Sequence, residues 1–120
     1  MYITLIACTG MNNPKLISGH NDIRMFNKND ETLFLNKIRM IFQTAYINNH
    51  DSLILGALSC GPLRGPVEHI ANLFKQVMHE YDGMFKSILF AIPCDAHEYI
   101  IKRNNQNIDI CTIFSQILFS

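Results

Sequence analysis

The stretch Asp51–Tyr81, DSLILGALSCGPLRGPVEHIANLFKQVMHEY, contains the clearest structural pattern in the chain. Its first part, Asp51–Leu58, is a short apolar run, which is typical of a strand covered on both faces. A turn rich in Gly and Pro follows. From Val67 to Tyr81, apolar residues then recur at i, i+3, i+4 and i+7, the spacing of an amphipathic helix. The sequence therefore predicts a strand, a loop and a helix in succession.

Comparable patterns flank this unit on both sides. Tyr2–Cys8 and Lys86–Ile92 are apolar runs that predict two more buried strands. Apolar residues at helical spacing predict a helix over Glu31–Asn48, with Asp30 placed to cap its start. The apolar run Ile108–Phe119 predicts a closing helix.

The polar stretch Thr9–Asp30 interrupts this alternation and is expected to be a long loop. Elsewhere strands alternate with helices, and parallel strands joined through helices need right-handed crossovers. We therefore expect an α/β fold, a three-layer α/β/α sandwich with a mainly parallel sheet. Because the chain has 120 residues and is 48% hydrophobic, residues 1–120 are expected to form a single domain.

Charge and hydropathy limit the classes of partner. Ten Lys and Arg balance ten Asp and Glu, so no nucleic acid polymer is expected as a partner. The chain has no run of about 18 consecutive apolar residues, the length that would span a membrane. Its first residues lack the basic leader of a secretory signal. We therefore expect a cytoplasmic protein without membrane contact.

The loop between the predicted strand and helix has the properties of an anion site. Gly61 and Gly65 permit close approach of the backbone to a ligand, and Pro66 suits the first turn of a helix. The N–H groups at a helix start favour an anion, and Arg64 could add a charge-assisted contact to a phosphate. The same Gly and Pro residues are also typical of an ordinary strand-to-helix turn.

A family resemblance rests on three ordered segments, Leu53–Pro66, Val67–Phe74 and Phe85–Ile92, and on the opening Ile3–Cys8. Together they resemble the second half of the microbial-type poly(ADP-ribose) glycohydrolase family, which belongs with the macrodomains. The resemblance implies a macrodomain-like fold that binds ADP-ribose or a cyclic ADP-ribose-type nucleotide and needs no cofactor. The ligand contacts that it implies are Thr9, Gly10, Ser59, Cys60, Gly61, Pro62, Leu63, Arg64 and Gly65.

Paired catalytic glutamates, which that family places beside a glycine-rich segment, have no counterpart in this sequence. The acids at Glu31, Glu68, Glu80 and Glu98 are isolated, and glycosidic hydrolysis needs a positioned acid. The leading hypothesis is therefore a module that binds and sequesters the nucleotide without turnover. Two alternatives stay open: an ADP-ribosyl glycohydrolase-type enzyme, and a scaffold or inhibitor with a decayed pocket. A homodimer would cover the open edge of the sheet.

Two other sets of residues could carry chemistry at the same edge of the sheet. Asp95 and His97 follow the third predicted strand, where His97 could act as a general base. Cys8, Cys60, Cys94 and His97 match a zinc site in ligand type. The four cysteines form no Cys-x-x-Cys pair, so buried thiols without a metal are the simpler expectation. The remaining histidines are expected in loops or on helix surfaces: His20, His50, His69 and His79.

Overall fold

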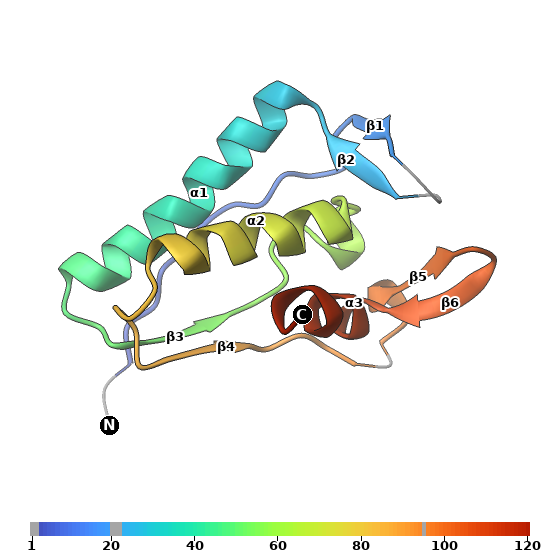
Figure 1. Ribbon diagram of the computed structural model, residues 1–120. Helices are drawn as coiled ribbons and strands as arrows, with labels where there is room; N and C mark the ends of the chain where they lie inside the picture. The colour runs from blue at the N-terminus through green and yellow to red at the C-terminus, as the bar shows by residue number, and fades with distance from the viewer. Residues whose placement is uncertain (1–2, 20–22, 95) are drawn as a thin grey trace.

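The computed structural model describes residues 3–19, 23–94 and 96–120, and Figure 1 labels their elements. The α-helices of this part of the chain are α1 (Lys28–Ile47), α2 (Val67–Glu80) and α3 (Ile110–Leu118). Its strands are β1 (Leu16–Ser18), β2 (Arg24–Phe26), β3 (Ser52–Leu55), β4 (Ser87–Phe90), β5 (Ile100–Arg103) and β6 (Gln106–Asp109). Two short 3-10 helices are η1 (Gly61–Leu63) and η2 (His97–Tyr99).

The strands form three two-stranded sheets. β3 and β4 pair in parallel, with Ser52 opposite Ser87 and Leu55 opposite Phe90. β1 pairs with β2, and β5 pairs with β6, both in antiparallel orientation. The α/β class expected from the sequence is therefore confirmed. A three-layer sandwich around a mainly parallel sheet is not confirmed, because four of the six described strands belong to antiparallel pairs.

In the described residues, helices cover one side of the β3–β4 sheet. Figure 1 shows α1 and α2 on the same side of these strands. Leu53 and Leu55 are buried in the core, whereas Ile54 is 73% exposed and Leu89 is 58% exposed. This alternation is typical of a strand with one covered face. The prediction that Asp51–Leu58 is covered on both faces is therefore wrong, since an apolar run also results when the open face is apolar.

The core is organised around α2, which packs against both α1 and α3. The ring centroid of Phe74 on α2 lies 5.2 Å from that of Phe90 and 6.3 Å from that of Phe114. Burial of such apolar surface is the dominant favourable contribution to folding. Other fully buried members of this core are Phe26, Phe34, Ile38, Phe42, Ile70, Val77 and Ile110.

The start of α1 differs from the prediction. The side-chain oxygen of Asn27 accepts the backbone N–H of Asp30 at 2.9 Å, so Asn27 is the N-cap and α1 begins at Lys28. The first turn of α1 is polar, and apolar spacing therefore could not reveal it. The predicted loop Thr9–Asp30 is wrong in the same region, because it contains β1 and β2.

The predicted strand Tyr2–Cys8 is wrong over residues 3–8, which form no strand; Tyr2 lies outside the described residues. Leu5 in this segment is 86% exposed. An apolar run forms a strand only where a neighbour supplies backbone hydrogen-bond partners. In the described part of the chain, β3 and β4 pair with each other and not with this segment.

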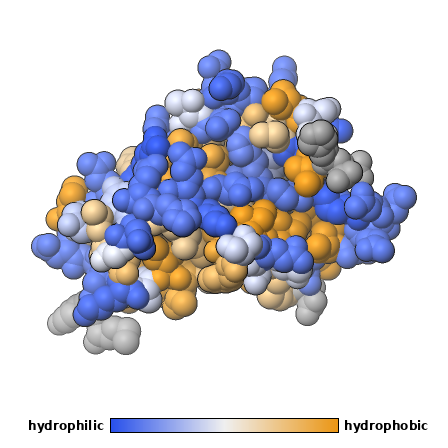
Figure 2. All heavy atoms as spheres, viewed as in Figure 1, coloured by the Kyte–Doolittle hydropathy of each residue, from blue (hydrophilic) through white to orange (hydrophobic). Residues whose placement is uncertain are grey.

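Figure 2 shows hydrophilic residues over α1 and α2, and hydrophobic surface over α3 and beside β3 and β4. Among the described helices, none combines the length and the apolar character that crossing a bilayer requires.

Candidate functional site

The loop between β3 and α2 closes on itself through backbone hydrogen bonds. The N–H of Gly65 donates to the carbonyl of Ser59 at 2.7 Å, and the N–H of Arg64 donates to the carbonyl of Gly61 at 2.9 Å. Cys60 donates its N–H to Ala57 at 3.0 Å. These three donors therefore hold the loop in shape, and a ligand would have to use other groups.

The two loop glycines are required by close packing. A Cβ atom at Gly61 would lie 2.9 Å from a ring carbon of Tyr99, and Gly61 has a φ of 66° that L side chains rarely adopt. A Cβ atom at Gly65 would lie 2.5 Å from the carbonyl oxygen of Ser59. Gly61 thus allows Tyr99 to pack against the loop, and Gly65 allows the loop to fold back on Ser59. Both glycines permit a close approach, as expected, but the approaching groups belong to the protein.

The segment around Gly10 packs against the β3–α2 loop, and a Cβ atom at Gly10 would lie 2.5 Å from the Ser59 hydroxyl oxygen. The backbone N–H of Met11 donates to the Ser59 hydroxyl at 2.6 Å, and the N–H of Asn13 donates to the carbonyl of Leu63 at 2.7 Å. Ser59 is 3% exposed, so its hydroxyl fixes the protein rather than facing solvent. Thr9 and Pro62 are exposed beside this contact, and Leu63 is half-buried.

Cys60 belongs to the hydrophobic core and is 3% exposed. Burial raises the pKa of its thiol to about 12, and the nearby Glu68 carboxylate contributes to the same direction. The thiol therefore stays protonated at neutral pH, and a protonated thiol is a poor nucleophile. Because its N–H donates to Ala57 and the whole residue is buried, the structure does not bring Cys60 to a ligand.

A cavity of about 260 Å³ opens where the loop meets the start of α2. Gly61, Arg64 and Gly65, three of the residues predicted from the sequence, contribute to its wall. The rest of the wall comes from both antiparallel hairpins and from the first residues of α2: Leu16, Arg24, Pro66, Val67, Ile101 and Arg103. The structure therefore adds two arginines, Arg24 and Arg103, to the predicted Arg64.

The charge of this cavity is positive. Arg103 is held in a bidentate ion pair with Glu68, with its Nε 2.6 Å from Oε2 and its Nη2 2.7 Å from Oε1. Glu68 is the acidic residue in the first turn of α2, so Arg103 neutralises the carboxylate closest to that helix end. Arg24 and Arg64 are exposed, and no ion pair within the described residues joins either of them to a carboxylate.

A turn signal in the sequence could have located Arg103. It immediately precedes Asn104 and Asn105, which have φ values of 53° and 63° and connect β5 to β6. Two-residue hairpin loops of this kind favour Asn because both central residues take positive φ. Arg24 lies on the three-residue strand β2, for which apolar periodicity gives no comparable signal.

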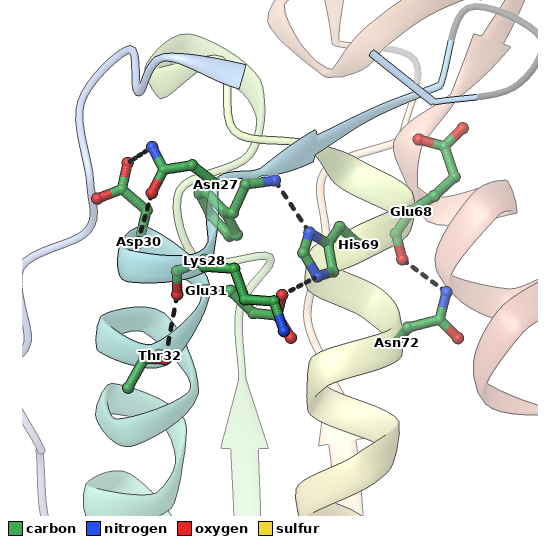
Figure 3. Close-up of polar contacts among 9 residues, drawn as sticks. Asn27, Lys28, Asp30, Glu31, Thr32, Glu68, His69 and Asn72 are labelled. Carbon is green, nitrogen blue, oxygen red and sulfur yellow. Dashed lines mark hydrogen bonds and ion pairs between the residues drawn. The ribbon is translucent and has the colours of Figure 1, made fainter. Parts of the chain in front are cut away.

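His69 is not a helix-surface residue, and that prediction is wrong. It lies on α2, is 8% exposed and accepts the backbone N–H of Phe26 on Nδ1 at 3.0 Å. Its Nε2 faces the Glu31 carboxylate at 3.7 Å, as Figure 3 shows. Because Nδ1 accepts a hydrogen bond, Nε2 carries the proton of the neutral ring. His69 therefore joins β2 to α2, which sets the position of the strand that carries Arg24.

His69 makes stability depend on pH. Burial lowers the pKa of His69 below its ordinary 6.5, and Glu31 opposes part of this shift. The unfolded chain then binds the proton more readily than the folded chain. The contribution of neutral His69 to the free energy of unfolding is therefore present above pH 6.5 and is lost as pH falls from 6.5 through the folded-state pKa. Hydrogen bonds from Lys86 and Arg39 lower the pKa values of the Asp51 and Glu80 carboxyl groups below their ordinary 3.8 and 4.5, so both carboxyl groups titrate below pH 4.5.

Urea denaturation between about pH 7.5 and 5 tests this dependence. His69→Asn keeps an acceptor for Phe26 and removes the titrating ring, so it is expected to abolish the decline in stability over that range. The matched control is His79→Asn on the exposed end of α2, which should retain the decline. An unchanged decline in the His69 variant would assign it to other groups.

The alternative catalytic and zinc sites gain no support in the described residues. Asp95 lies outside them, and His97 is exposed on η2. No group of three or more His, Cys, Asp or Glu side chains in the described residues could hold a metal ion. The zinc set of Cys8, Cys60, Cys94 and His97 is therefore wrong, because Cys60 is in the core and Cys94 instead contacts Cys111.

Comparisons with protein-family models, with curated proteins and with solved structures find no match to this chain.

Proposed function

We propose that this chain is a macrodomain-like nucleotide-binding domain that holds ADP-ribose or a cyclic ADP-ribose-type nucleotide and sequesters it without turnover. The observation that carries the proposal is the cationic cavity beside the β3–α2 loop. Arg24 and Arg64 line it without an ion pair in the described residues. Two guanidinium groups at one cavity suit a ligand with two linked phosphates.

The start of α2 supports the same ligand chemistry. Pro66 is its N-cap and makes no side-chain capping bond, and Val67 begins the helix at the cavity wall. The N–H groups of a first helical turn carry partial positive charge and bind anions. Leu16, Val67 and Ile101 add an apolar part to the wall, which suits contact with a ribose or a base.

The size of the cavity indicates which part of the nucleotide it would hold. Pockets for whole small molecules are usually about 300–1,000 Å³, and this cavity is about 260 Å³. We propose that it receives the diphosphate, while the rest of the nucleotide extends outside the cavity toward the exposed residues Pro62 and Thr9.

The composition of the wall favours binding over hydrolysis. No Asp or Glu of the described residues lines the cavity, and the nearby Glu68 is held by Arg103. Hydrolysis of a glycosidic bond needs an acid that can reach the leaving group. The enzyme hypothesis would therefore depend on a residue that the described structure does not bring to this cavity.

A homodimer in the cytoplasm is part of the same proposal. β3 and β4 have only each other as neighbours in the described structure, and their outer face carries the exposed Ile54 and Leu89. A second copy would cover the open edges and apolar face and complete a layered, macrodomain-like arrangement. Sedimentation equilibrium is expected to give a dimer mass, and a purely monomeric protein would remove this part of the proposal.

Calorimetric titration with ADP-ribose, AMP and inorganic pyrophosphate tests the function. ADP-ribose is expected to bind at least about tenfold more tightly than AMP, because a second charge-assisted phosphate contact contributes about 1.5–3 kcal/mol. Chromatography of the recovered ligand should return unchanged ADP-ribose. Conversion would favour the hydrolase hypothesis, and the absence of heat with all three ligands would favour the decayed scaffold.

A further inference from the structure

Cys94 and Cys111 lie together although 17 positions separate them in the chain. Cys94 follows Pro93 in the exposed segment after β4, and Cys111 is half-buried in the first turn of α3. Their Sγ atoms are 2.9 Å apart, and the Cys94 thiol donates to the Cys111 sulfur. The sequence offered no Cys-x-x-Cys spacing to indicate this contact.

The geometry of the two thiols is close to that of a bonded pair. A disulfide has a sulfur–sulfur length of about 2.05 Å, so the two sulfurs need to approach by only about 0.9 Å from their present separation of 2.9 Å. Solvent can reach Cys94, because its side chain is exposed. The other cysteines differ: Cys60 is buried in the core, and Cys8 hydrogen-bonds to the carbonyl of Thr9.

We propose that Cys94 and Cys111 are a thiol–disulfide site that a low-molecular-weight disulfide oxidises reversibly. The Cys94 thiolate attacks one sulfur of glutathione disulfide, whose S–S bond breaks and releases one glutathione thiolate. The Cys111 thiolate then attacks Sγ of Cys94, and the second glutathione leaves as a thiolate. Both cysteine protons end on the two glutathione molecules, so the dithiol loses two electrons and glutathione disulfide gains them.

The new bond would close a covalent loop that contains residues beside the cationic cavity. Residues 94–111 include Tyr99, which packs against Gly61, and Ile101 and Arg103, which line the cationic cavity. A crosslink restricts the unfolded chain more than the folded one and so stabilises the fold. Oxidation is therefore expected to raise Tm by about 5–10 °C for a loop of this length in a domain of this size.

Mass spectrometry of the whole protein tests the site. The reduced chain is equilibrated with mixtures of reduced and oxidised glutathione, quenched in acid, unfolded and alkylated. At high oxidised glutathione we expect two of the four thiols to resist alkylation, no retained glutathione, and one crosslinked peptide containing Cys94 and Cys111. Reduced glutathione should restore all four alkylated thiols.

Single variants separate the intramolecular bond from ordinary surface oxidation. Cys111→Ser is expected to stop at a mixed disulfide between Cys94 and glutathione, without the rise in Tm. Cys8→Ser is the matched control and should form the crosslink like the parent chain. Glutathione held separately on Cys94 and Cys111, or four alkylatable thiols at every glutathione ratio, would overturn the proposal.

Discussion

Phe74→Ala is expected to lower the free energy of unfolding by about 3–5 kcal/mol, the usual cost of removing a buried aromatic ring. Phe74 is 1% exposed, and its ring contacts the ring of Phe90 on β4 and the ring of Phe114 on α3. Because α2, β4 and α3 all meet at this ring, the surrounding residues can close the resulting cavity only in part. The loss is a large share of the roughly 5–15 kcal/mol that stabilises a typical domain.

Urea denaturation followed by circular dichroism measures this effect. The matched control is Phe119→Ala, because Phe119 is 79% exposed, and its effect should stay within about 0.5 kcal/mol. If the Ala variant does not fold, Phe74→Leu still reports on the site, with a smaller loss. A loss near that of the Phe119 control would show that the core is not organised around α2.

The sequence predicted well those elements whose own residues reveal which face is buried. The helix predicted over Val67–Tyr81 is found at Val67–Glu80, because a long apolar stripe leaves little choice of period. Lys86–Ile92 contains β4, and Ile108–Phe119 contains α3. α2 and α3 contribute buried core residues, and the expected α/β class follows from these elements. The predicted burial of Lys86–Ile92 is wrong, because Leu89 on β4 is 58% exposed, and Ile88 and Phe90 are only partly buried against the core.

The candidate site was predicted less completely, because its wall depends on chain segments that are distant in sequence. Arg64 and the loop glycines could be located from the Gly- and Pro-rich turn, but Arg24 and Arg103 reach the cavity on short, mostly exposed strands. The burial of His69 was missed for the same reason, because it depends on β2 and Phe26 lying against α2. The periodicity of apolar residues within one segment does not reveal contacts between segments that are distant in sequence.

Arg64→Glu is expected to weaken binding of ADP-ribose by at least about 100-fold, or roughly 2.7 kcal/mol. The variant loses a charge-assisted contact to phosphate, which contributes about 1.5–3 kcal/mol, and adds a carboxylate that repels the ligand. Arg64 is exposed, so the fold should be little affected. Added salt is expected to weaken binding to the parent chain and to narrow this difference, since salt screens exposed charges.

Arg64 is a better test position than Gly61, although both line the cavity. Any side chain at Gly61 would meet the ring of Tyr99 and require a strained φ, so a Gly61 variant would report on loop packing as well as on charge. The matched control is Lys102→Glu, which makes the same change of net charge on β5 at a position outside the cavity wall. Equal losses in the Arg64 and Lys102 variants would indicate a general charge effect. A large loss confined to Arg64 would locate the phosphates beside the β3–α2 loop.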